Sequence, residues 1–190
     1  SASISATLLI ALHGLEDMMS NFSSIGFDKV ADTANIILLI PAAVSDFLAG
    51  TAWNSGAGVS GYYPNSGIDD VAFLNALIDS VAKQYAINTK RVYLCGFSMG
   101  GFMSERMACE SAGKITAIAS VSGTIGGGLT CNPAKHIPVA HFHGTADPTV
   151  GYTANQYGMD AEPLVEKWVQ YNQCDTSPKH HRFADLAKDG

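Results

Sequence analysis

The chain has 190 residues, of which 47% are apolar and 15% are charged, and its formal net charge is −6. This length suits one domain with a sizeable hydrophobic core, and the composition is that of an ordinary globular protein. The acidic balance and the absence of a basic patch exclude a nucleic-acid-binding surface, and no apolar run is long enough to span a bilayer.

The first half of the chain alternates predicted strands and helices. Residues 7–12 and 36–40 are continuous apolar runs, typical of strands buried on both faces of a parallel sheet. Between them, residues 27–33 carry a short amphipathic pattern. Residues 41–67 are irregular, and a loop of this length in a compact domain is usually functional. Residues 68–85 form the clearest predicted helix, because their apolar side chains recur on one stripe.

The second half continues the same alternation. Residues 92–95 predict a strand, residues 101–111 a helix, and residues 117–121 another buried strand. A strand at 139–143 and a helix at 161–172 complete the pattern. Because strands alternate with helices, the fold class is α/β with a mostly parallel sheet and helices on both faces.

The pentapeptide Gly-Phe-Ser-Met-Gly, centred on Ser98, lies between a predicted strand and a predicted helix. This strand–turn–helix context is the one that a nucleophile elbow requires, because the glycines allow a sharp turn that exposes the serine. The sequence therefore predicts Ser98 as a catalytic nucleophile. The competing interpretation is a glycine-rich turn with an idle serine.

A serine nucleophile also needs an acid and an oxyanion hole. Asp147 follows the predicted strand at 139–143, at the sheet edge where catalytic groups collect in open α/β folds, so we predict it as the acid. The alternative is a plain turn aspartate before Pro148. The backbone N–H groups of Met99, directly after the nucleophile, and of Leu15, after the first strand, are the predicted oxyanion donors.

The general base is the one catalytic group without a clear candidate. The histidine should follow the acid in the chain, and only His180 and His181 do so, in a segment without a preceding apolar strand. We expect this pair to lie on the surface. His13 precedes the serine and is expected to brace its loop. His141 and His143 lie on a predicted strand, where burial is expected.

The four cysteines show no metal-ligand spacing, and the sequence indicates neither a metal site nor a cofactor. Cys95 ends a predicted buried strand and is expected to be a packed free thiol. Cys131 and Cys174 lie in polar, loop-like sequence, where a disulfide is plausible in an exported protein.

Several motifs together resemble the extracellular poly(3-hydroxybutyrate) depolymerase and feruloyl esterase family of α/β hydrolases. They are Ala-Leu-His-Gly at 11–14, Ala-Trp-Asn at 52–54, Ile-Asp-Asp-Val-Ala-Phe-Leu at 68–74, Arg-Val-Tyr at 91–93, the elbow at 96–101 and His-Gly-Thr-Ala-Asp-Pro at 143–148. The resemblance extends from about residue 8 to residue 174. The ordered set is more specific than any of its members.

The resemblance implies a metal-free serine esterase, secreted or periplasmic, that cleaves a polyester, feruloyl or short-chain acyl ester through an acyl-serine. It implies Ser98 and Asp147 as catalytic residues. Trp53 is a candidate for the substrate pocket, and packing of its loop is the equal alternative. It also implies a histidine in a Gly-Gly-Gly-His-Thr-Trp type motif after a final strand, which this sequence lacks. We therefore expect residues 1–190 to be one α/β-hydrolase domain that is C-terminally incomplete, without the last strand and terminal helix.

Two other functions remain open at this stage. A chain without the triad histidine is also consistent with a non-catalytic binding domain that keeps the hydrolase fold. A serine peptidase of the prolyl-oligopeptidase type shares the elbow, but the sequence contains no propeller domain. The sequence leaves the acyl group, the alcohol and the oligomeric state open.

Overall fold

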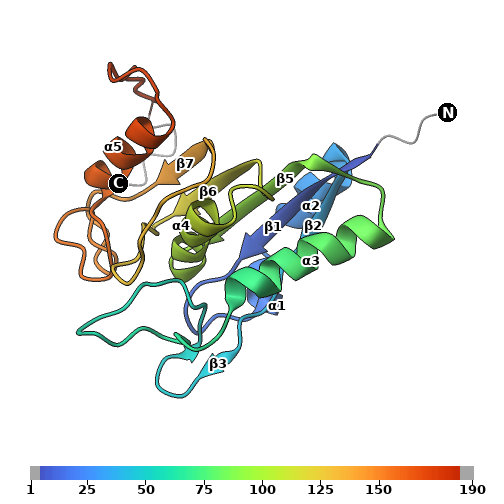
Figure 1. Cartoon of the computed structure of the whole chain (residues 1–190), viewed down its shortest axis with the longest axis horizontal. Helices are drawn as coiled ribbons and strands as arrows, with labels where there is room; N and C mark the ends of the chain where they lie inside the picture. The colour runs from blue at the N-terminus through green and yellow to red at the C-terminus, as the bar shows by residue number, and fades with distance from the viewer. Residues whose placement is uncertain (1–4, 185–190) are drawn as a thin grey trace.

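The computed structural model describes residues 5–184 and contains a five-stranded, fully parallel sheet (Figure 1). The strand order is β2-β1-β5-β6-β7. The strands are β1 (Ala6–Leu12), β2 (Ile36–Leu39), β5 (Ile87–Phe97), β6 (Ala117–Val121) and β7 (Val139–Phe142). All four pairings are parallel, so the carboxyl ends of the strands lie along one edge of the sheet.

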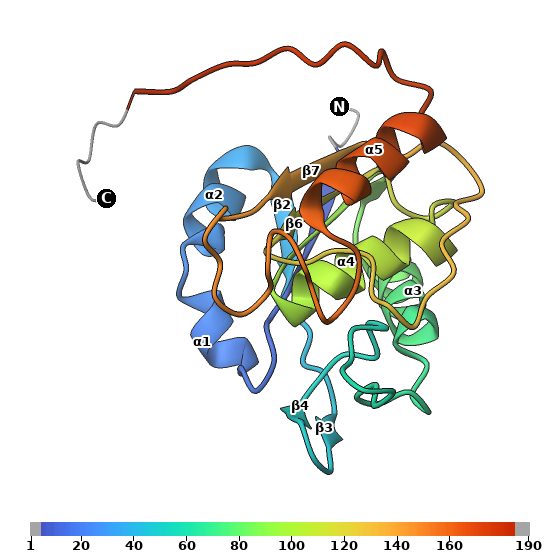
Figure 2. The same cartoon turned by 90° about the vertical axis from the view of Figure 1, so that its left-hand side faces the viewer.

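Helices cover the sheet unequally (Figure 2). They are α1 (Met19–Ser23), α2 (Phe27–Ala34), α3 (Asp70–Gln84), α4 (Met99–Glu110) and α5 (Ala161–Tyr171). Figure 2 shows α1 and α2 on one side of the sheet and α3, α4 and α5 on the other. The predicted α/β-hydrolase arrangement of a parallel sheet with helices on both faces is confirmed.

One segment differs from the sequence-based expectation. The long segment before α3 contains a small hairpin, β3 (Ser45–Asp46) and β4 (Gly50–Thr51). The Asp46 carboxylate organises the hairpin by accepting hydrogen bonds from the backbone N–H groups of Leu48 and Ala49. These are turn contacts of an aspartate, which hydrophobic periodicity does not reveal.

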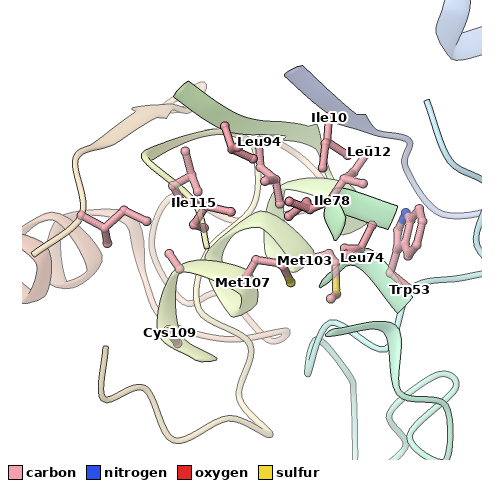
Figure 3. Close-up of a cluster of buried hydrophobic side chains, with 14 of the residues drawn as sticks. Ile10, Leu12, Trp53, Leu74, Ile78, Leu94, Met103, Met107, Cys109 and Ile115 are labelled. Atoms are coloured by element: carbon pink, nitrogen blue, oxygen red, sulfur yellow. The ribbon is translucent and has the colours of Figure 1, made fainter. Parts of the chain in front are cut away.

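The core lies between the sheet and the helices α3 and α4 (Figure 3). Ile10 and Leu12 of β1 and Leu94 of β5 point into it, opposite Met103 and Met107 of α4, and all five are buried. Each such side chain contributes roughly 1.5–3 kcal/mol on burial. This packing fixes α4, and with it the turn that precedes α4, against the carboxyl ends of β1 and β5.

A disulfide joins Cys109 of α4 to Cys131 in the loop after β6. The suggested pairing of Cys131 with Cys174 is therefore wrong, and Cys174 is an exposed free thiol. Cys95 is free and half-buried, as expected.

The outer strand β7 pairs with β6 along one edge, and no strand within residues 5–184 pairs with its other edge. The segment after α5 leaves the body of the molecule instead of returning to the sheet (Figure 2). In the described part of the chain no helix combines the length and the apolar character that crossing a membrane requires.

Candidate active site

Ser98 lies on the turn between β5 and α4, at the carboxyl edge of the sheet. Its backbone has φ 53° and ψ −119°, a conformation that non-glycine residues rarely adopt. The turn is held from outside by the hydrogen bond from the Ser98 N–H to the Val121 carbonyl, at 2.8 Å. Such strain persists only where surrounding structure enforces it, and it is concentrated at functional sites.

Two glycines around Ser98 allow the close approach of backbone segments. A Cβ at position 96 would lie 2.1 Å from the Gly100 carbonyl oxygen. A Cβ at position 100 would lie 2.1 Å from the Leu12 carbonyl oxygen. Neither position therefore accepts a side chain without moving α4 or β1. The glycines of the pentapeptide are explained by this geometry.

Ser98 opens on a small pocket with about 70 Å³ of free space. Its lining residues come from four separate parts of the chain: Leu15, Ala57, Ser98, Met99, Phe102, Thr149, Val150 and Tyr157. Both predicted oxyanion donors, Met99 and Leu15, are among them. Within residues 5–184, the N–H groups of Met99 and Leu15 donate to no other protein group. They are free to donate to an oxyanion, as the chemistry requires.

Asp147 lies in the loop after β7, close to this pocket. Its Oδ1 accepts hydrogen bonds from the N–H groups of Thr149 and Val150, at 2.9 and 3.0 Å, and both of these residues line the pocket. Burial alone would raise the pKa of the Asp147 carboxyl. The Thr149 N–H, the Ser122 hydroxyl, the Val150 N–H and nearby His143 together outweigh burial and lower it. Asp147 is thus held as a carboxylate.

The His13 ring has both nitrogens engaged in its own loop. Nε2 accepts from the Ala43 N–H at 3.0 Å, and Nδ1 lies 2.7 Å from the Gly14 carbonyl oxygen, to which it donates. The ring is fully buried. His13 braces the loop that carries Leu15, as the sequence predicts, and both of its ring nitrogens already have partners.

The other histidines also lie outside the Ser98 pocket. His143 Nδ1 is 3.1 Å from His141 Nε2, and His143 Nε2 is 2.7 Å from the Val150 carbonyl oxygen and 3.8 Å from Asp147 Oδ2. Burial, and then the neighbouring His143, lower the pKa of His141 to about 4. His180 and His181 are exposed on the segment after α5, as expected. No histidine of residues 5–184 lines the pocket.

Of the two roles left open for Trp53, the structure supports packing. Its side chain is fully buried in the core beside Leu74 (Figure 3), and its Nε1–H donates to the His13 carbonyl oxygen at 3.1 Å. The indole anchors the segment 52–54 to the loop after β1, which argues against a place in the substrate pocket.

Sequence reasoning missed the apolar wall of the pocket. Phe102 was within reach, because it lies one helical turn after Ser98, and its N–H donates to the Ser98 carbonyl oxygen. Ala57, Val150 and Tyr157 carry no local signal, since they belong to loops that meet only in the folded protein. Across residues 5–184, no group of three or more His, Cys, Asp or Glu side chains is placed to hold a metal ion.

Curated relatives of this chain are esterases. The bifunctional acetylxylan esterase/xylanase XynS20E of Neocallimastix patriciarum is 32% identical over 146 residues, covering 76% of this chain and 20% of that protein. Feruloyl esterase B of Piromyces equi is 31% identical over 145 residues, covering 70% of this chain and 26% of that protein. The chain therefore spans about a quarter or less of the length of these relatives.

Solved structures share the fold. A thermostable esterase superposes with a TM-score of 0.66 at 18% identity, covering 90% of this chain and 45% of that one. Arabidopsis thaliana SOBER1 superposes with a TM-score of 0.66 at 20% identity, covering 90% and 85%. The feruloyl esterase part of the predicted resemblance is supported by the relatives above, whereas the poly(3-hydroxybutyrate) depolymerase part stays a prediction. The model of the phospholipase/carboxylesterase family matches residues 2–183, so this chain belongs to the phospholipase/carboxylesterase family of α/β hydrolases.

Proposed function

We propose that this chain is the catalytic core of a serine carboxylic ester hydrolase. The observation that carries the proposal is the strained Ser98, which opens on a pocket that also contains two unused backbone N–H groups. In the proposed reaction, Ser98 Oγ bonds to the acyl carbon, and the Met99 and Leu15 N–H groups stabilise the resulting oxyanion. The ester C–O bond then breaks, and the alcohol leaves with the serine proton, which a base transfers.

Water completes the proposed cycle. It attacks the acyl-serine, gives one proton to the base, and releases the acid as Ser98 regains its proton. Asp147 would orient and stabilise the protonated base, which suits a carboxyl held as a carboxylate.

The open edge of β7 supports a proposal for the missing base. A groove with about 270 Å³ of free space lies beside this edge, between β7 and α5, and is lined by Val139, His141, Leu164 and Trp168 among others. The His141 Nδ1 atom is buried there without a hydrogen-bond partner in the described residues. A further parallel strand beside β7 would end next to Asp147, where a triad histidine is required. In this proposal residues 1–190 are one hydrolase domain that is completed by such a strand.

The substrate proposal rests on the relatives and on the pocket. Feruloyl and acetylated polysaccharide esters are the classes that the relatives' names indicate, and a polyester is the further candidate from the motif resemblance. The proposed location is extracellular or periplasmic. The Cys109–Cys131 disulfide supports it, because such bonds persist in oxidising compartments.

The test compares the protein that includes the completing strand proposed above with its Ser98→Ala variant, on p-nitrophenyl acetate and butyrate. We expect the wild type to be at least about 1,000-fold faster, since a triad without its nucleophile keeps only residual catalysis. Ser80→Ala on the remote helix α3 is the matched control and should keep the wild-type rate. Equal rates for the wild type and Ser98→Ala would refute the proposal.

A second function, a binding domain without catalysis, is favoured by one observation: no histidine of residues 5–184 lines the Ser98 pocket. A fluorophosphonate probe separates the two, because an unactivated serine reacts slowly with it. Rapid stoichiometric labelling that Ser98→Ala abolishes would rule out the binding domain.

A further inference from the structure

The pocket beyond Ser98 ends against a small group of apolar side chains. Ala57, Phe102 and Val150 are buried together, and Tyr157 packs against them. The pocket has about 70 Å³ of free space. Sites for drug-sized ligands have roughly 300–1,000 Å³, so this pocket suits a much smaller group.

The position of this pocket indicates which half of an ester it would hold. In serine esterase chemistry the acyl group stays bonded to Ser98 while the alcohol departs to solvent. A pocket that begins at the nucleophile, includes the oxyanion donors Met99 and Leu15, and closes on buried side chains suits the group that stays. The pocket is therefore on the acyl side.

The walls of the pocket are fixed by separate contacts. Phe102 is tied to the nucleophile by its N–H, which donates to the Ser98 carbonyl oxygen at 3.0 Å. The Val150 N–H donates to Asp147 Oδ1. The Tyr157 backbone is held on both sides, because its N–H donates to Asn155 Oδ1 and its carbonyl accepts from the Gly127 N–H.

The wall at Ala57 is fixed by backbone packing. A Cβ at position 126 would lie 2.2 Å from the Gly56 carbonyl carbon and 2.5 Å from the Ala57 nitrogen, so these segments touch without room to spare. Separate contacts therefore position the backbone of each of the four wall residues.

Resting on the serine esterase function proposed above, we propose that this pocket is an acyl site for short groups, from acetyl to butyryl, and that Ala57 and Tyr157 set its size limit. A feruloyl group, with an aromatic ring on a propenoyl chain, is larger than the group that a pocket of about 70 Å³ suits. In this proposal the chain has the acyl-group specificity of an acetyl esterase and not that of a feruloyl esterase.

The first test measures kcat/KM for p-nitrophenyl acetate, butyrate, octanoate and ferulate, which share one leaving group. For the wild type we expect acetate and butyrate to exceed octanoate and ferulate by at least about tenfold. Tyr157→Ala removes a wall and should raise the octanoate-to-acetate ratio by about tenfold. Ala57→Leu fills the pocket and should lower the butyrate-to-acetate ratio by about tenfold. Tyr85→Ala, an exposed tyrosine at the end of α3, should leave all ratios at wild-type values.

The second test reads the pocket without turnover. Methanesulfonyl fluoride and the bulkier phenylmethanesulfonyl fluoride each bond sulfur to Ser98 Oγ as fluoride leaves and the serine proton is lost, and intact mass reports the product. The wild type should react faster with the small reagent, and Tyr157→Ala should narrow the difference several-fold. Equal preference for small and large groups in either test, unchanged in Tyr157→Ala, overturns the size limit but leaves the esterase function standing. No hydrolysis of any ester together with no labelling of Ser98 overturns the esterase function itself.

Discussion

The two faces of the sheet differ sharply, and β5 shows the difference within one strand. Leu94 points toward α4 and is 1% exposed, whereas Phe97, on the opposite face, is 48% exposed. The neighbouring strands repeat the pattern, because Val121 of β6 and Phe142 of β7 are also exposed on that side. Helices α3, α4 and α5 cover one face, while α1 and α2 lie over only part of the other (Figure 2).

This difference between the two faces shows which parts of the candidate site are held in place by packing within the described chain. The packed face holds α4 and therefore fixes Ser98 and the Met99 N–H. The open face carries a groove with about 410 Å³ of free space between Phe22, Ile25 and Phe27 on one side and Phe97 and Val121 on the other. The proposed nucleophile and the Met99 N–H therefore depend on the packed face.

The largest expected effect comes from Gly100→Ala, at the point where α4 meets β1. The new Cβ would lie 2.1 Å from the Leu12 carbonyl oxygen and 2.6 Å from the His13 carbonyl oxygen. We expect esterase activity to fall about a hundredfold because Ser98 is displaced. Urea denaturation should show a loss of about 3 kcal/mol in the free energy of unfolding.

Gly113→Ala is the matched control for that substitution, because nothing lies within 4 Å of its Cβ position. It should leave both activity and stability near the wild type. If Gly100→Ala kept the same activity and stability as Gly113→Ala, the close packing of α4 against β1 at position 100 would be refuted.

The second prediction compares the two faces directly on β5. Leu94→Ala should cost about 2–5 kcal/mol, since it leaves a cavity under α4. Phe97→Ala should cost less than about 1 kcal/mol if its face is open to solvent. Both losses in the free energy of unfolding are measured from the midpoints of urea denaturation, provided that the dependence of this free energy on urea concentration stays constant. A Phe97→Ala cost as large as that of Leu94→Ala would mean that another part of the protein covers the open face.

Local signals explain what could be predicted from the sequence. The strand–turn–helix pattern around Ser98 lies within about fifteen residues, so the local sequence is sufficient to predict its geometry. The five parallel strands also follow from short apolar runs. The pocket, by contrast, joins Leu15, Ala57, Phe102 and Tyr157, which share no local pattern.

Long-range packing decides two features that the local sequence does not. Trp53 packs in the core, and its Nε1–H donates to the His13 carbonyl oxygen, forty residues away. Cys131 was matched to Cys174 by similar surroundings, but the fold brings Cys109 on α4 to it. The strand–turn–helix geometry around Ser98, by contrast, is local and is predicted correctly.

The smallest predicted effect concerns Glu105, a fully buried carboxyl on the packed face. The Trp168 Nε1–H of α5 donates to its Oε2 at 2.8 Å, and Oε1 has no partner in the described residues. Burial raises the pKa of Glu105 to about 8, although the Trp168 N–H acts in the opposite direction. In the unfolded chain the same group ionises near 4.5. Between these values the folded protein keeps a proton that the unfolded chain releases, so stability falls as pH rises.

Glu105→Gln keeps an acceptor for the Trp168 N–H but cannot ionise. Comparison with this variant therefore isolates the contribution of the Glu105 carboxyl to the pH dependence of stability. A difference of one bound proton is worth about 1.36 kcal/mol per pH unit, so the wild type should lose about 2 kcal/mol relative to Glu105→Gln between pH 5 and pH 6.5. Urea denaturation of both proteins at the two pH values measures the difference. Parallel stability profiles would show that the Glu105 carboxyl reaches water and ionises in the folded state, so that the packed face is less closed than the contrast with Phe97 implies.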